Sequence, residues 1–373
     1  MDTAKSSVAV APSSLRAAGD KRRVRLSSSL GWLFAAMFLP FLVLGSALLA
    51  FQWSQQRDLA YGQLKEQAQS LRLAVERELA LDEAVANALA ASQDVDKGDW
   101  ATFHAMAKAA SQVRPGGWFV VVDRDGQNIL NTNVPFGSPL PNLRKVLARP
   151  MKAEWQGRRI PLPEIGLFDA PLLTGKAAHS GLVYGPVSKR PVVAINVPVM
   201  RDDKPLYVLG LAYSSDFYVK LVQAQPAAEG LIRAVFDASG LIVARNVDPD
   251  TFVGHHAAPP FDKGIAAPMS PEGIGETTTL DSIPVFYAYS RSMVNGWGVA
   301  VAMPSRTVLA PAWRAVWTWL AVLLSVGLLG SALAFRLWRR LAVPLGALAA
   351  QARSLADEPL AIPRSGIEEV EVL

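Results

Sequence analysis

Two long apolar segments of the chain carry no charged residue. The first lies between Arg25 and Arg57, and the second lies between Arg314 and Arg336. The apolar run 30–53 would form a helix about 36 Å long, which is enough to cross a hydrocarbon core of about 30 Å. We therefore predict two membrane-spanning helices, over residues 30–53 and 312–338.

Other structures also fit these apolar segments. A cleaved signal peptide would explain the first, although its apolar run exceeds the usual length of about 7–15 residues. Buried core helices of a soluble protein would explain both. Tryptophans near the segment ends favour the spanning interpretation, because indole rings prefer the membrane interface; these are Trp32, Trp53, Trp313 and Trp338.

Residues 54–92 have the periodicity of an amphipathic helix. Apolar residues recur there at spacings of three and four, at Leu64, Ala68, Leu71, Val75, Leu79, Val85 and Leu89. No proline interrupts this pattern. We predict one stiff helix about 58 Å long, which we call the stalk. Asp99 is placed to cap a shorter helix that runs to about Ser111.

Beyond the stalk, a β-hairpin pattern occurs twice. Residues 119–131 place two apolar strands around a turn from Asp123 to Gly126, and residues 234–245 repeat this arrangement 114 positions later. Aspartate at the start and glycine at the end of such a turn is typical hairpin chemistry.

A second pair of hairpins repeats with a spacing of 93, at 191–212 and 284–303. Each copy thus consists of a hairpin, a middle segment of variable length and a second hairpin. This repeated order predicts two similar modules in series. The fold class is therefore α+β: a long stalk helix and two tandem antiparallel-sheet modules, at 93–215 and 216–311.

The charge distribution indicates topology. The tail 1–29 holds six basic and two acidic residues, whereas residues 54–311 hold 25 of each sign. Basic residues also follow the second apolar segment, so the positive-inside rule places both termini in the cytoplasm and residues 54–311 outside. A nucleic-acid partner is not expected, because such proteins carry their basic excess on a folded face.

Several longer stretches resemble a known family. Residues 128–141, 184–199, 233–254 and 276–304 are similar to the outer sensor regions of bacterial sensor histidine kinases, and the order of elements resembles a double Cache (dCache) domain with tandem PAS-like modules. The segment 339–373 resembles a partial HAMP linker, in which Leu341, Leu345 and Leu348 form a helical seam. An ordinary juxtamembrane amphipathic helix is the alternative for this segment.

The resemblance implies a small-molecule pocket in the membrane-distal module, between its sheet and residues 132–190. The candidate lining residues are Asn131, Tyr184, Arg190, Asn196, Tyr207 and Tyr213. Ala212 stands about where amino-acid-binding relatives place an aspartate, so a free amino acid is not the expected ligand. We predict no cofactor, no metal and no catalytic residues. The chain has no cysteine, and adjacent residues such as His255 and His256 do not converge on one ion without further ligands.

The resemblance further implies a two-pass protein of the bacterial inner membrane that forms a homodimer through its HAMP-like helices. The expected function is the ligand-sensing input of a two-component histidine kinase. The alternatives are the same module on a diguanylate cyclase or a chemoreceptor, an output-less anchored binding protein, and an anchored enzyme outside the cytoplasm.

Overall fold

The computed structural model describes residues 26–148, 153–164, 166–226, 230–263 and 270–354. The helices are α1 (Leu26–Ala90), α2 (Gln93–Asp96), α3 (Trp100–Val113), α4 (Leu143–Leu147), α5 (Gly166–Thr174), α6 (Ser215–Ala224), α7 (Pro249–Phe252) and α8 (Ser305–Ser354). Asp99 caps α3 as predicted, because its Oδ1 accepts from the amide of Thr102 at 3.0 Å. The chain forms two compact units that meet in sequence between Phe51 and Gln52.

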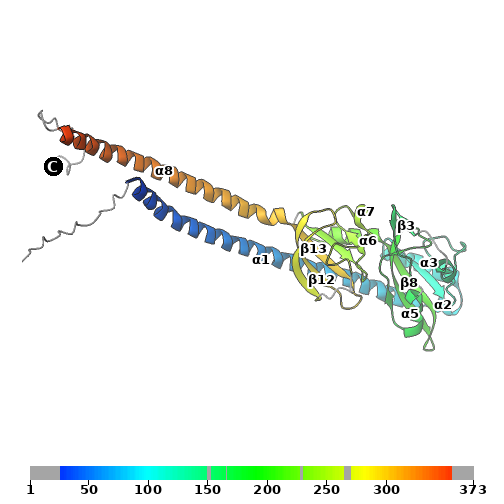
Figure 1. Cartoon of the computed structure of the whole chain (residues 1–373). Helices are drawn as coiled ribbons and strands as arrows, with labels where there is room; N and C mark the ends of the chain where they lie inside the picture. Colours follow the sequence, from blue (N-terminus) through cyan, green and yellow to red (C-terminus); the bar gives the residue numbers. More distant parts are fainter. Residues whose placement is uncertain (1–25, 149–152, 165, 227–229, 264–269, 355–373) are drawn as a thin grey trace, which may run out of the picture. The chain divides into compact units, whose positions relative to one another are not determined.

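Two antiparallel sheets carry the predicted hairpins (Figure 1). The first sheet has the strand order β2-β1-β8-β7-β5, with β6 also paired to β7, and the second has the order β10-β9-β13-β12-β11. Their strands are β1 (Gly117–Asp123), β2 (Asn128–Asn131), β5 (Ala178–His179), β6 (Val183–Tyr184), β7 (Pro191–Arg201), β8 (Lys204–Ser214), β9 (Ile232–Phe236), β10 (Ile242–Arg245), β11 (Glu272–Thr278), β12 (Pro284–Arg291) and β13 (Gly298–Pro304). A separate ribbon joins β3 (Glu154–Trp155) to β4 (Arg158–Arg159). The prediction of an α+β fold with antiparallel sheets is confirmed.

The sequence repeat reappears in the strand register. Val120 pairs with Gly210 in the first sheet, and the residue 114 positions later, Ala234, pairs with Ala300 in the second. Likewise, Ala194 pairs with Ala212, and the residue 93 positions later, Tyr287, pairs with Ala302. The two sheets are therefore two copies of one arrangement.

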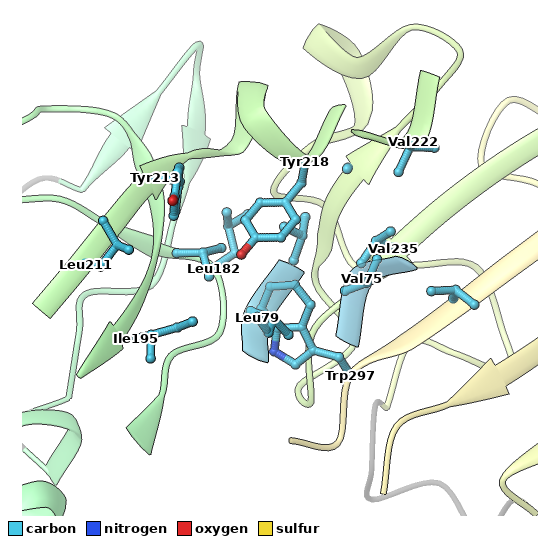
Figure 2. Close-up of a cluster of buried hydrophobic side chains, with 14 of the residues drawn as sticks. Val75, Leu79, Leu182, Ile195, Leu211, Tyr213, Tyr218, Val222, Val235 and Trp297 are labelled. Carbon is cyan, nitrogen blue, oxygen red and sulfur yellow. The ribbon is translucent and has the colours of Figure 1, made fainter. Parts of the chain in front are cut away.

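The stalk part of α1 packs against both sheets. Its predicted apolar stripe is buried at Leu64, Ala68, Leu71, Val75 and Leu79, none of them more than 3% exposed. Figure 2 shows Val75 and Leu79 among side chains of both sheets and of α6. There the ring of Tyr218 from α6 lies 5.4 Å from that of Trp297, which precedes β13.

Helix α8 starts at the residue that follows β13. Its part Ser305–Leu337 contains an 18-residue stretch with a mean hydropathy of 2.0, and it is the one helix among the described residues that is long and apolar enough to cross a membrane. The predicted first span falls within α1, but the side chains of residues 30–38 and 41 are outside the description. The predicted first HAMP-like helix falls within α8 as far as Ser354, whereas residues 355–373 and residues 1–25 of the basic tail lie outside the described residues.

A buried ion cluster fixes the stalk to the first sheet. Oδ1 of Asp82, which is fully buried, accepts from Nε of Arg114 and from the hydroxyl of Tyr213, both at 2.7 Å. Nη2 of Arg114 also lies 2.7 Å from Oε2 of Glu78. Oδ2 of Asp82 has no partner among the described residues. Burial raises the pKa of Asp82 above its usual value, although Tyr213 and Arg114 both oppose this shift.

This raised pKa predicts a specific pH dependence. In the unfolded chain the pKa of Asp82 is about 3.9. Between this value and the higher pKa of folded Asp82, the folded state binds more protons than the unfolded state. The contribution of Asp82 to stability therefore falls as pH rises through its folded pKa. Asp82→Asn keeps an oxygen that accepts from Arg114 and Tyr213 and removes the titration. We expect the Tm of the variant, relative to that of wild type, to rise as pH increases from about 3.9 through the folded pKa of Asp82.

Thermal unfolding of the full chain in detergent at several pH values tests this. The control is Asp58→Asn, on the same helix, where the aspartate side chain is 73% exposed; this variant should follow the wild-type profile. A constant Tm difference between Asp82→Asn and wild type at all pH values would contradict the prediction.

Candidate functional site

A largely apolar cavity lies on the first sheet. The space open to the centre of a water-sized sphere is about 80 Å³. Its sheet side comes from β1, β2, β7 and β8, and its other side comes from Pro163, Leu167, Phe168 and residues 183–188. The cavity therefore lies between the sheet and the long middle segment, where the sequence resemblance predicts a pocket.

Three of the six predicted site residues line this cavity, namely Asn131, Tyr184 and Asn196. The structure does not bring the other three to it. Tyr213 points to the stalk and bonds to Asp82, and the ring of Tyr207 lies 5.3 Å from that of Trp100. Arg190 does not line the cavity but lies at an adjoining surface recess, which shares Trp118 and Ser188 with it. Nη1 of Arg190 is 3.9 Å from Oδ2 of Asp216.

The alternation of strand residues explains this division. On β8, Gly210 and Ala212 face the cavity, whereas Leu211 and Tyr213 belong to the core around the stalk. Tyr207 has the same parity as Tyr213, so it falls on the stalk face as well. The core residues Val208 to Tyr213 are buried without alternation, so the sequence alone offers no signal for which face carries the cavity.

The polar atoms in the cavity are few and uncharged. Nδ2 of Asn131 and Oδ1 of Asn196 make no hydrogen bond with a described residue, although the other amide atom of each does. Oγ of Ser188 is buried without a described partner. Sequence reasoning missed Ser188, because a serine in a loop carries no distinctive pattern. Among the described residues that line the cavity, none is charged.

Close packing holds Asn196 in place. A Cβ atom at Gly210 would lie 2.6 Å from Oδ1 of Asn196, so only glycine leaves room for this amide on the neighbouring strand. Nδ2 of Asn196 donates to the carbonyl of Leu167 at 3.3 Å, which links the strand to the residues on the opposite side of the cavity. The free oxygen is thereby fixed at the cavity surface.

The cavity wall 183–188 is also tied to the second sheet. The amide of Leu182 donates to Oδ2 of Asp237 at 2.8 Å, and a Cβ atom at Gly181 would lie 2.5 Å from the same oxygen. Oδ1 of Asp237 accepts from the amides of Ser239 and Leu241 in its own turn. One carboxylate therefore organises a turn of the second sheet and holds the segment that leads into the cavity wall.

The equivalent residue of the first repeat, Asp123, has only the local role. Its Oδ1 accepts from the amide of Gln127 at 2.8 Å. No hydrogen bond of Asp123 to a residue outside its own turn occurs in the described part of the chain. The two aspartates thus provide a matched pair for experiments.

The sequence matches no known family model. It also matches no curated protein.

Solved structures of similar fold exist. The extracellular domain of rpHK1S-Z16, assigned as a histidine kinase, is 15% identical, with a TM-score of 0.48 over 70% of this chain and 98% of that one. The ligand-binding domain of the Campylobacter jejuni chemoreceptor Tlp3, in complex with L-valine, is 11% identical, with a TM-score of 0.49 over 69% and 98%. That of the Pseudomonas fluorescens chemoreceptor CtaA, in complex with L-serine, is 11% identical, with a TM-score of 0.47 over 68% and 98%.

Each of these alignments covers nearly the whole of the neighbour and about 70% of this chain. The assignment of two repeated antiparallel modules rests on strand order and register. In fold, the chain is similar to extracellular sensor domains of histidine kinases and chemoreceptors.

Proposed function

We propose that this chain is the ligand-sensing input of a transmembrane signal receptor. The observation that carries the proposal is the continuous path from the cavity to an apolar helix. The cavity wall is held by Asp237 of the second sheet, and the last strand of that sheet, β13, runs without a linker into α8.

The proposed topology has two membrane spans, residues 30–53 and 312–338, with both termini in the cytoplasm and residues 54–311 outside. The apolar part of α8 supports the second span, and the two charge-free segments with their basic flanks support the orientation. The modules at 93–215 and 216–311 are then membrane-distal and membrane-proximal, and 339–373 is the start of a HAMP-like linker.

We propose that this sensor module is the input of a two-component histidine kinase. The alternative is a diguanylate cyclase or a chemoreceptor. A homodimer is proposed because a HAMP-like helix buries its apolar seam only against a partner. The chain itself is proposed to have no catalytic role.

The chemistry of the first cavity defines the proposed ligand class. A zwitterion such as a free amino acid would bury two charges without partners, which costs several kcal/mol for each ion. An uncharged, mostly apolar molecule instead matches the walls, with Asn131 as a donor and Asn196 as an acceptor for its polar group. We therefore propose a small, uncharged ligand.

Two probes with the same carbon skeleton test this ligand class. Isovaleramide is uncharged, whereas L-valine has a similar apolar body and two charges. We expect isovaleramide, and not L-valine, to raise the Tm of the full chain in detergent. A ligand at about 100 times its Kd stabilises by about 2.7 kcal/mol. Ala194→Leu fills the first cavity and should abolish the effect.

The control for this experiment is Ala300→Leu, in the second sheet, which should keep the response to isovaleramide. A response to L-valine that exceeds the response to isovaleramide would refute the uncharged ligand class. A response that survives Ala194→Leu would refute the first cavity as its site.

The aspartate pair tests the connection between cavity and second sheet. In Asp237→Asn, one oxygen becomes an amide nitrogen, so the bonds to Leu182 and to the turn cannot both be kept. Loss of a hydrogen bond that leaves a buried donor unpaired costs about 1–3 kcal/mol. We expect faster hydrogen exchange at Leu182 and weaker binding of the ligand of the first cavity.

Asp123→Asn is the matched control, since Asp123 makes only local bonds. Hydrogen exchange followed by mass spectrometry on the full chain would resolve the peptide that contains Leu182. Equal exchange of this peptide in Asp237→Asn and Asp123→Asn would show that Asp237 does not hold the cavity wall.

The topology can be tested with single cysteines, because the natural chain has none. Met293 is 81% exposed. In cells with a permeable outer membrane and an intact inner membrane, Met293→Cys should react with a maleimide that cannot cross the inner membrane. Ser14→Cys and Ser354→Cys should react only after lysis. Protection of Met293→Cys in intact cells would contradict the topology, and absence of the Ser14→Cys label after lysis would indicate that the first segment is cleaved.

A further inference from the structure

A second cavity lies on the second sheet. Its volume is about 70 Å³ by the same measure, close to that of the first. Its lining comes from β9, β10, β12 and β13, together with Ala257, Ala258, Phe261, Thr277, Thr279 and Leu280. Its walls are mainly apolar, and no function discussed above uses it.

The two cavities occupy equivalent positions of the repeat. The first cavity is lined from β1 and β2 by residues 118, 120, 128 and 131. The second cavity is lined from β9 and β10 by the residues 114 positions later, which are 232, 234, 242 and 245. On the other hairpin, residues 192, 194, 210 and 212 correspond by strand register to 285, 287, 300 and 302, which line the second cavity. The second cavity is thus a repeated feature of the fold.

One substitution between the repeats changes the chemistry of the site. Where the first cavity has Asn131, the second has Arg245, and these residues pair with the equivalent partners Val120 and Ala234. Arg245 is only 3% exposed, and its Cζ lies 4.0 Å from the centre of the Phe252 ring. Among the described residues that line the second cavity, Arg245 is the one with a charge.

The guanidinium group of Arg245 is only partly used by the protein. Its Nη2 donates to both carboxylate oxygens of Asp281, each at 3.0 Å. Its Nε and Nη1 donate to no described residue, although the side chain lines the cavity. A buried guanidinium with unused donors is a strong site for an anionic acceptor.

Asp281 need not prevent an anion from binding. Its side chain is 23% exposed, so it can turn toward water when another carboxylate takes its place beside Arg245. The bound anion would then neutralise Arg245, while the apolar walls would enclose the rest of the molecule.

We propose that the second cavity is a second binding site, selective for a small monocarboxylate with a short apolar chain. The carboxylate binds Arg245 and the chain lies against the walls formed by Tyr287, Ala300 and Ala302. This site differs in ligand class from the uncharged ligand proposed for the first cavity, and it does not depend on that ligand.

Calorimetric titration of the full chain in detergent with acetate, propionate, butyrate and butyramide tests the proposal. We expect saturable binding that strengthens with chain length up to butyrate, and binding of butyramide that is weaker by at least about tenfold, because it lacks the charge. Arg245→Asn, which places the residue type of the first repeat in the second, should weaken butyrate binding by a similar factor.

Two further variants protect the test from a folding defect. Asp281→Asn removes the competing carboxylate and leaves Arg245 in place, so butyrate should bind several-fold more tightly than to wild type. Ala194→Leu fills the first cavity and should leave butyrate binding unchanged. The proposal would be overturned if none of the three carboxylates bound saturably, or if butyramide bound as tightly as butyrate. Weaker butyrate binding in Asp281→Asn, or loss of butyrate binding in Ala194→Leu, would also overturn it.

Discussion

The apolar stripe of the stalk is the constraint on which the two sheets depend. Leu64, Leu71 and Leu79 are at most 3% exposed, and they belong to one core with residues of both sheets. Neither sheet can cover the stalk face of its own strands without this helix, and an amphipathic helix of this length has little stability unless its apolar side is covered. The stalk therefore acts as a shared core element, so a shift of either sheet along it changes packing that the other sheet also uses.

The repeat conserves backbone positions while a few side chains set different roles. The same register places a cavity on each sheet, yet the uncharged Asn131 lines one cavity where Arg245 lines the other. Similarly, Asp123 organises only its own turn, whereas Asp237 also holds Leu182. A duplicated fold can thus keep its geometry and still assign separate chemistry to each copy, because binding depends on residues that the register does not fix.

Much of the fold was accessible from the sequence because its signals are local. The spacing of the stalk residues and the turns that begin at Asp123 and Asp237 specify a helix and two hairpins without any tertiary information. Only half of the predicted site residues line the cavity. Asn131, Tyr184 and Asn196 lie there, whereas Arg190, Tyr207 and Tyr213 lie elsewhere. A strand such as β8 is buried on both faces, so its sequence does not show which parity meets the cavity. The bond between Asp237 and Leu182 joins residues 55 positions apart, and nothing in either local sequence indicates it.

The junction between β13 and α8 determines how a change in either cavity can reach the membrane. Ala300 and Ala302 line the second cavity, and Pro304 ends the strand one residue before the helix begins. A strand inside a sheet resists bending, and a helix transmits axial displacement because its hydrogen bonds are internal. A shift of about 1–2 Å at β13 is therefore passed to α8 rather than absorbed by a loop, and shifts of this size are sufficient to change the packing of helices at an interface. Because Asp237 joins the first cavity to the second sheet, a change in either cavity can reach the same strand, β13.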